Sequence, residues 1–334
     1  MNFIIKNIAL YALLFACNLP LLAQVDAMTH LIAAREHIKA NNEQLAKLEI
    51  DSALHISPMH AMANTMMGDL MNKRKNYLKA LLSYDKAILS NANNAPLYIK
   101  RANLHIQLNN HRAYIISDFD RAIDLEPDNT THYIKKAHYL ASSVNHQSLK
   151  PDFLLAAETI SRAIVFNRAE AELFFLRSKY RFGAEQNLAA LADIKKAIDL
   201  VPDNAEYLAQ SGYINFMIDN YRAAFSDYSN AININQKKPA YFEFRGHANY
   251  NMERFIKAYD DYSQGIDLVI NELSSKNNKI SFDDPLNKQL RMMLLYRGMS
   301  LVQDNKPYDG CDDFERAYQM GETKARNYMR KYCN

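Results

Sequence analysis

The chain offers few residues whose type and spacing could carry out catalysis or hold a metal. Its ten histidines are scattered, with no HExxH and no pair at the spacing of three or four that aims two imidazoles at one metal from adjacent helical turns. Its eight glycines form no phosphate-binding loop, and no recognisable nucleophile motif is present. We therefore expect a protein that is not an enzyme and that has no cofactor and no metal site.

The cysteines are the remaining candidates for chemistry. Cys311 and Cys333 lie near the C-terminus without a CxxC motif or a neighbouring histidine, so neither thiol catalysis nor metal binding is indicated. If the chain is exported, an oxidising compartment favours a disulfide between them. The alternative is a pair of free, buried thiols.

Residues 1–23 read as an export signal. Lys6 is their only charge, an apolar run extends from Ile8 to Cys17, and the small residue Ala23 ends the segment. The alternative is a lipoprotein anchored at Cys17, because the four residues that end there loosely resemble a lipobox. The run is short for a membrane span, and no later segment is apolar for long enough. We expect an exported chain in the periplasm, at the cell surface or secreted, with no transmembrane segment after processing.

The charge balance restricts the class of partner. The formal net charge is +3 over 334 residues, and no block of like charges is present. A nearly neutral chain lacks the excess positive charge that is typical of proteins that bind nucleic acid or an acidic membrane surface. We therefore expect no nucleic-acid partner.

The strongest pattern in the chain is an alanine that returns at a nearly constant interval. The series is Ala53, Ala87, Ala122, Ala163, Ala197, Ala231, then Gly265 and Ala317. With this residue as position 27 of a 34-residue unit, small residues also recur at positions 8 and 20, and a bulky residue recurs at position 24. Small side chains let two helices cross closely, and the bulky one fills the space between them. The sequence therefore predicts helical hairpins that stack on one another.

This pattern resembles the tetratricopeptide repeat over essentially the whole chain after residue 23, most clearly at 187–198 and 221–232. The resemblance implies an all-α fold, an α-α superhelix of about eight helical hairpins, wound right-handed and closed by a C-terminal capping helix. We expect a single tetratricopeptide-repeat solenoid over 24–334. Its units are 27–60, 61–94, 95–129, 130–170, 171–204, 205–238, 239–272 and 291–324, with a cap at 325–334. The cap segment with Cys311 and Cys333 also resembles the end of exported bacterial repeat proteins, which again implies the disulfide.

Two places interrupt the repeat, an extension at 142–150 and a spacer at 273–290. Long loops in repeat proteins often carry binding contacts. In the spacer, however, Asp284 followed by Pro285 is typical of a helix start. We favour a lengthened helix with a short loop over a functional insertion.

Arginine at position 7 accompanies aspartate at position 23 in four units. The pairs are Arg101 with Asp118, Arg177 with Asp193, Arg245 with Asp261, and Arg297 with Asp313. Unit six keeps only the aspartate, Asp227. Joint presence predicts a contact between the two helices of a unit, and such pairs are usually structural rather than ligand-binding.

In this repeat family the first helix of each unit lines the concave face, and the resemblance implies that positions 2, 5, 9 and 12 point inward. In units five to eight these positions form an aromatic and apolar stripe with polar members. The candidate partner-binding residues are Phe175, Lys179, Phe182, Tyr213, Phe216, Glu243, His247, Tyr250 and Met299. Aromatic anchors with polar neighbours suit recognition of a peptide or protein. The alternative is that some of these rings pack into the core of the array itself.

The features together favour a non-enzymatic protein–protein interaction scaffold or adaptor in the bacterial cell envelope, which holds a peptide or protein segment in its concave groove. The alternative function is an accessory protein that binds a glycan or a small ligand by stacking on the same rings.

Overall fold

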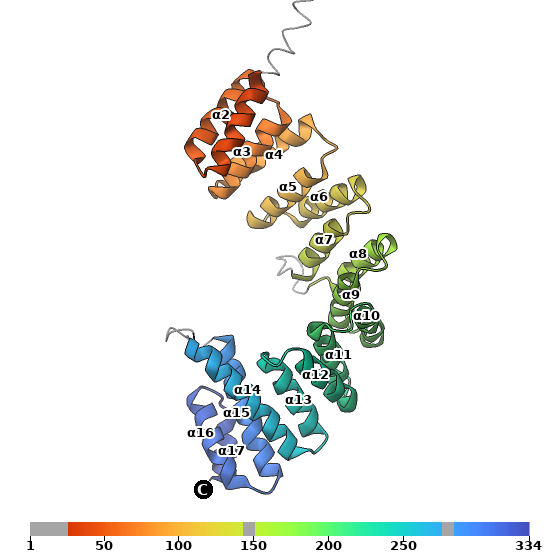
Figure 1. The fold of residues 1–334 in the computed structure, drawn as a ribbon, viewed down its shortest axis with the longest axis vertical. Coiled ribbons are helices and arrows are strands. Elements are labelled where there is room, and N and C mark those ends of the chain that lie inside the picture. The colour runs from red at the N-terminus through yellow and green to blue at the C-terminus, as the bar shows by residue number, and fades with distance from the viewer. Residues whose placement is uncertain (1–25, 143–150, 276–283, 334) are drawn as a thin grey trace, which may run out of the picture. The chain divides into compact units, whose positions relative to one another are not determined.

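In the computed structural model, which describes residues 26–142, 151–275 and 284–333, every regular element is a helix (Figure 1). The export signal expected at 1–23, Cys17 and residues 143–150 of the expected extension lie outside these ranges. Contacts divide the chain into two compact units, residues 1–151 and 152–334. The single solenoid over 24–334 stays a prediction.

The N-terminal unit is a run of helical hairpins. It consists of helical residues 26–39, α2 (Glu43–Ile56), α3 (Ala61–Lys73), α4 (Tyr77–Ser90), α5 (Ala95–Gln107), α6 (Arg112–Leu125) and α7 (Thr130–Ser142). Each helix from α2 to α6 packs against the next one along the chain. Helices α3, α5 and α7 begin at the residues that open units two, three and four of the repeat pattern.

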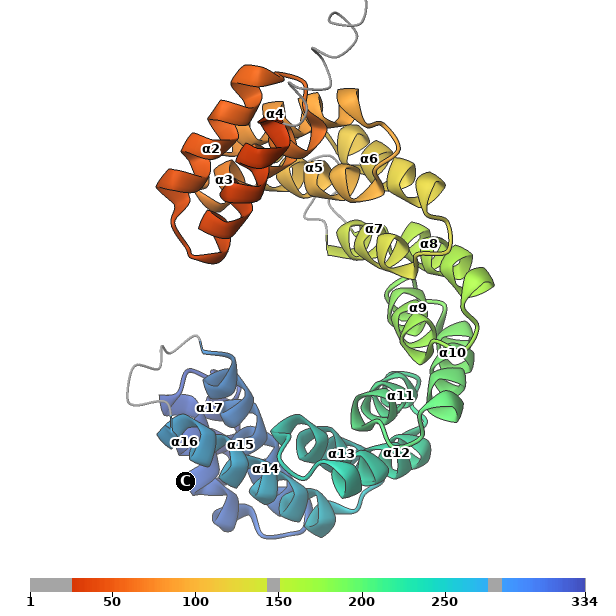
Figure 2. The same ribbon diagram turned by 45° about the horizontal axis from the view of Figure 1, so that its top comes forward.

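The C-terminal unit continues the same alternation. It consists of α8 (Phe153–Phe166), α9 (Ala171–Gly183), α10 (Asn187–Leu200), α11 (Ala205–Met217), α12 (Tyr221–Ile234), α13 (Pro239–Asn251), α14 (Phe255–Ser275), α15 (Pro285–Gln303), the short 3-10 helix η1 (Pro307–Gly310), α16 (Cys311–Gln319) and α17 (Ala325–Tyr332). Figure 2 shows that α9 and α11 lie on the inner side of this row of helices and that α10 and α12 lie on its outer side.

The described part of the spacer at 273–290 is helical. Helix α14 runs on to Ser275, and α15 begins at Pro285, six residues before the unit expected at 291. The Asp284 carboxylate caps α15 by accepting a hydrogen bond from the Leu286 amide at 2.8 Å. The lengthened helix and the capped start are therefore as the sequence predicts.

The helix crossings explain the small residues at position 8. A methyl group added at Gly246 would lie 2.8 Å from the Tyr262 ring, and one added at Gly298 would lie 2.7 Å from the Phe314 ring. Both rings are fully buried. The expected pairing of a small position 8 with a bulky position 24 is confirmed in these hairpins.

Seven hairpin turns share a backbone feature that the sequence pattern does not reveal. Each has one residue with φ near +60° at position 15 of its unit, where a Cβ atom is crowded. These residues are Asn41, Lys75, Asn109, Glu185, Asp219, Glu253 and Asn305. The amide that follows reaches back five residues, as from Asn76 to the Met71 carbonyl at 2.8 Å, which closes the helix end.

Helix α17 caps the C-terminal hairpin. Its Tyr328 ring stacks on the buried Phe314 ring of α16 at 5.2 Å between centroids, and Ala325 is fully buried. A disulfide joins Cys311 at the start of α16 to Cys333 just after α17, with the two Cα atoms 5.7 Å apart. The exposed flank of the last hairpin is thereby covered.

Candidate partner-binding groove

The candidate residues lie on the first helices of successive hairpins. Phe175, Lys179 and Phe182 are on α9, whereas Tyr213 and Phe216 are on α11. Glu243, His247 and Tyr250 are on α13, and Met299 is on α15. Helices α9, α11, α13 and α15 each touch the next, which places these side chains along one face of the C-terminal unit.

A hollow of about 430 Å³ lies on this face between α9, α11 and α13. Its walls are mostly aromatic rings, and its polar groups come from Lys179, Glu206 and Gln210. The lining residues are Phe175, Lys179, Glu206, Ala209, Gln210, Tyr213, Tyr228, Ala240, Tyr241 and Phe244. We call this hollow the groove. Three of the nine candidates, Phe175, Lys179 and Tyr213, line it.

The rings of the groove belong to a continuous series of contacts. Tyr213 lies 5.4 Å from Phe182 and 5.5 Å from Phe244, both in edge-to-face geometry. Phe244 also lies 6.3 Å from Phe216 and stacks on the buried Tyr228 at 5.7 Å. The packing alternative raised by the sequence applies in part, because the rings pack on one another and Phe175 is buried. Phe182, Tyr213 and Phe244 leave part of their surface exposed, so partner binding through them stays a prediction.

The groove has two unpaired charges of opposite sign. Lys179 is exposed, and its Nζ lies 5.2 Å from the centroid of the Phe175 ring. Glu206 is exposed at the second residue of α11, near Tyr241, whose pKa is raised by burial and by this carboxylate. Neither charge has an ion-pair partner among the described residues. A bound segment would therefore meet a basic group on α9 and an acidic group on α11.

Glu243 and His247 are already engaged within the protein. Gln289 of α15 donates a hydrogen bond to the Glu243 carboxylate at 2.7 Å, and the His247 Nδ1 lies 2.7 Å from the Tyr262 hydroxyl. Burial raises the pKa of Tyr262 well above its usual value. The His247 ring also packs against Tyr296 at 4.5 Å. These contacts tie α13 to α14 and α15 and stiffen the wall beside the groove.

The last two candidates lie farther along the same face. The Tyr250 ring packs edge-to-face on Phe255 at 5.5 Å, and burial raises the pKa of Tyr250. Met299 is half-buried against the cluster of α14 to α17 that contains Phe314. Neither residue lines the groove.

Sequence reasoning missed Phe244, Tyr241, Glu206 and Gln210. Tyr241 occupies position 3 and Gln210 and Phe244 occupy position 6 of their units, which were not expected to face inward. Glu206 occupies position 2, which was expected to face inward but yielded no candidate residue. One available signal was that position 6 is aromatic twice in succession, at Phe244 and Tyr296. Both rings contact His247.

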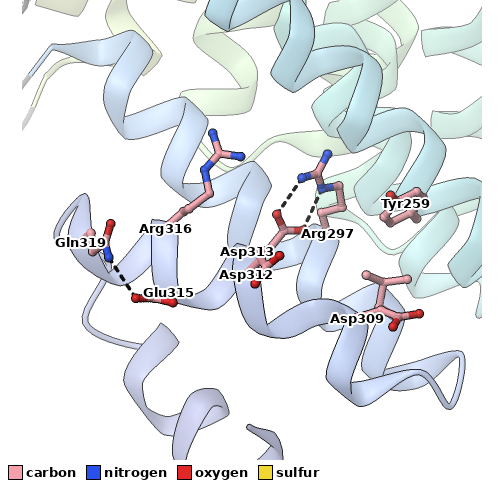
Figure 3. Close-up of a pocket in the computed structure, with 9 residues that line it drawn as sticks. Tyr259, Arg297, Asp309, Asp312, Asp313, Glu315, Arg316 and Gln319 are labelled. Carbon is pink, nitrogen blue, oxygen red and sulfur yellow. Dashed lines mark hydrogen bonds and ion pairs between the residues drawn. The ribbon is translucent and has the colours of Figure 1, made fainter.

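The four arginine–aspartate pairs form as predicted. Arg101, Arg177 and Arg297 each donate to both carboxylate oxygens of their partner, and Arg245 donates twice to one oxygen of Asp261. Figure 3 shows Arg297 facing Asp313 in this way, at 2.8 and 2.6 Å, with Tyr259 of α14 close by. The arginine side chains are largely buried, and the aspartates more so. The pairs are a structural contact between the helices of one hairpin.

The third guanidinium nitrogen of each arginine, Nη1, reaches the preceding hairpin. Each Nη1 donates a hydrogen bond of 2.8 to 3.5 Å to a side chain there. The pairs are Arg101 with Asp85, Arg177 with Ser161, Arg245 with Ser229, and Arg297 with Ser263. In unit four, Lys136 makes a similar bond at 2.6 Å to Asp120 of α6, which the sequence analysis did not predict. These bonds join one hairpin to the next.

Among the residues with defined positions, no three His, Cys, Asp or Glu side chains gather as metal ligands. In the same ranges, no helix combines the length and the apolar character needed to cross a bilayer.

Comparison with known proteins places the fold. No protein-family model matches the sequence, and no curated protein matches it significantly. Among solved structures, the C-terminal part of a TPR repeat-containing protein from Cytophaga hutchinsonii is similar with a TM-score of 0.60 at 13% identity, over 78% of this chain and 98% of that one. PilW, a type IV pilus biogenesis factor, gives a TM-score of 0.49 at 12% identity, over 70% and 98% of the two chains. YrrB, a TPR protein with an unusual peptide-binding site, gives 0.44 at 20% identity, over 55% and 90%. With its stacked helical hairpins and its small and bulky crossing residues, the chain has the tetratricopeptide-repeat fold.

Proposed function

We propose that this protein is a non-enzymatic scaffold of the bacterial cell envelope that holds a peptide or protein segment in the groove. The groove is the observation that carries the proposal. It combines partly exposed rings with two unpaired charges, and such rings contribute most of the binding energy at many protein interfaces.

The contact surface of the proposal is the groove with its flanking rings. Phe175, Lys179 and Tyr213 contact the partner, and Phe182 and Phe216 extend the surface beside them. Glu243, His247, Tyr250 and Met299 shape and stiffen the adjoining wall. Because the first helices are held rigidly by their hairpins, the segment binds without a large rearrangement of the scaffold.

The envelope location rests on residues 1–23 and on the cysteine pair. An export signal carries the chain out of the cytoplasm, and a disulfide persists in an oxidising compartment. Intact-mass measurement of the protein recovered from the envelope tests this. A chain that begins after Ala23 supports cleavage, a lipid-modified Cys17 supports the anchored form, and a full-length cytoplasmic chain contradicts export.

Site-specific photo-crosslinking in living cells tests the groove. A photoreactive phenylalanine analogue replaces Gln210, which lines the groove, and in a second strain it replaces Lys195, which is exposed on α10. We expect a discrete protein adduct from position 210 only. The change Lys179→Glu removes this adduct without altering the melting temperature, because its side chain is exposed.

Equal adducts from positions 210 and 195, or none from position 210, would contradict the proposal. If no protein is captured but a glycan mixture raises the melting temperature and Lys179→Glu or Tyr213→Ala abolishes that rise, the stacking alternative holds instead.

A further inference from the structure

The outer face of α4 carries a row of leucines that stays exposed among the described residues. Leu78, Leu82 and Leu89 are 68%, 62% and 77% exposed. At 100° per residue they fall within about 40° of one another around the helix, so they form one stripe. Burial within the hairpin does not explain them, since α4 packs through Ala80, Tyr84 and Ala87 on its other side.

This stripe sets α4 apart from the other second helices of the array. The three leucines occupy positions 18, 22 and 29 of their unit. At the same positions α10 has Leu188, Ala192 and Asp199, and α12 has Arg222, Ser226 and Asn233. Helix α8 has Leu154 and Val165 but Glu158 between them. Among the described second helices, α4 is alone in having a leucine at all three positions.

Two lysines border the stripe on one side. Lys79 and Lys86 lie about 40° to 100° around the helix from the leucines, and both are exposed. Neither ammonium group takes part in an ion pair within the described ranges. The nearby Asp85 carboxylate is bound to Arg101 at 2.8 Å, so it does not neutralise them.

We propose that the outer face of α4, defined by Leu78, Leu82, Leu89, Lys79 and Lys86, docks on an anionic phospholipid surface. An apolar stripe bordered by lysines is the pattern of helices that lie in a membrane interface, where the leucines enter the acyl region and the ammonium groups meet lipid phosphates. The proposal is independent of the groove, which lies in the C-terminal unit.

The lysines favour lipid over a protein partner. Lysine is depleted from protein–protein interfaces, whereas it is enriched beside the apolar face of membrane-surface helices. The near-neutral total charge, which by itself did not indicate binding to an acidic membrane, does not conflict with lipid binding at α4. A total charge averages over the whole chain, but electrostatic attraction to a surface acts only within about 10 Å.

Vesicle sedimentation of the purified mature chain tests the proposal. The probes are vesicles that contain phosphatidylglycerol and vesicles of phosphatidylcholine alone. We expect binding to the anionic vesicles, weakened by added salt. Each lysine strengthens such binding about fivefold, so Lys79→Gln with Lys86→Gln weakens it roughly 25-fold. Leu82→Gln with Leu89→Gln abolishes it.

Leu188→Gln is the matched control, because Leu188 has the same repeat position as Leu78 and is 81% exposed on α10. We expect this variant to bind as the unaltered chain does. All changed side chains are exposed, and a melting curve verifies that each variant is folded. No binding to anionic vesicles, or binding that the α4 variants leave unchanged, overturns the proposal. Size-exclusion chromatography in which the leucine variant dissociates a dimer without affecting vesicle binding assigns the stripe to a second copy and overturns it as well.

Discussion

Arg297 and Asp313 join α15 to α16 through two hydrogen bonds, and the same guanidinium reaches Ser263 of α14 at 3.2 Å. One side chain therefore connects both helices of its hairpin with the hairpin before it. Hydrogen bonding to Asp313, opposed by desolvation, raises the pKa of Arg297, which keeps it charged at every ordinary pH.

Replacement of Arg297 by methionine should destabilise the C-terminal hairpin strongly. It leaves the Asp313 carboxylate, only 6% exposed, without a cation, and breaking a buried pair in this way costs about 3–5 kcal/mol. Arg297→Lys restores the charge but loses the planar two-pronged geometry, so we expect an intermediate loss. Urea unfolding measures both. Lys39→Met is the control, because the Lys39–Glu36 pair is exposed to solvent and should contribute little to stability. Equal losses of unfolding free energy in Arg297→Met and Lys39→Met would show that Arg297 does not stabilise the protein by joining α15 to α16 and α14.

Asp227 is the aspartate of unit six, whose arginine is replaced by Ser211. Burial raises the pKa of Asp227, and the hydrogen bonds that it accepts from Ser211 and Asn215 oppose this only in part. A raised pKa in the folded state means that the ionised carboxylate costs stability as pH rises through that pKa. We therefore expect Asp227→Asn to stabilise the protein at pH 7, with the gain disappearing below the unfolded pKa of 3.8.

The comparison for Asp227→Asn is Asp193→Asn, measured by urea unfolding at neutral and acidic pH. Asp193 accepts hydrogen bonds from Arg177 and Arg181, so its neutralisation leaves two cations without their counter-charge and should destabilise. If both variants lose stability at pH 7, the raised pKa of Asp227 does not govern what this side chain contributes to folding stability.

The hairpin turns offer a stabilising change. Lys75 and Glu185 adopt φ of 59° and 61°, where a residue other than glycine or asparagine loses about 1–2 kcal/mol. Lys75→Asn or Glu185→Asn should recover roughly 0.5–1 kcal/mol without the unfolded-state entropy that glycine adds. Asn109→Gly serves as the control and should change little. The urea midpoint is the measurement, and a loss of stability in both asparagine variants would contradict the strain argument.

These turns show where sequence reasoning reached its limit. The helix crossings were predictable, because a small residue such as Gly298 and a bulky one such as Phe314 recur in phase and can be read from the printed chain. The left-handed turn residues recur just as regularly, but no residue type marks them. The glycines that usually do so serve mostly at crossings here.

The groove was predictable in part for a similar reason. Phe175 at position 5 and Lys179 and Tyr213 at position 9 were found, because the resemblance to the repeat family implies that these positions of a first helix face inward. Phe244 and Tyr241 were missed because the groove lies between three helices. Its wall includes residues on the flank of α13 as well as residues on the inward face of that helix. Such a wall depends on how far one hairpin is rotated against the next, which a single sequence does not express.

The disulfide should hold α17 on the last hairpin. Cys311 and Cys333 are 22 residues apart, and closing a loop of this length restricts the unfolded chain by about 3 kcal/mol. In Cys333→Ser, or after reduction, we expect the amide protons of α17 to exchange faster, with those of α3 and α4 unchanged as an internal control. Helix α17 depends on this attachment, because an eight-residue helix is marginal in water on its own. Alkylation of the protein isolated from the envelope, with and without reductant, reports whether the bond forms in the cell. Two cysteines that react without reductant, or unchanged exchange in α17 after reduction, would rule out this role.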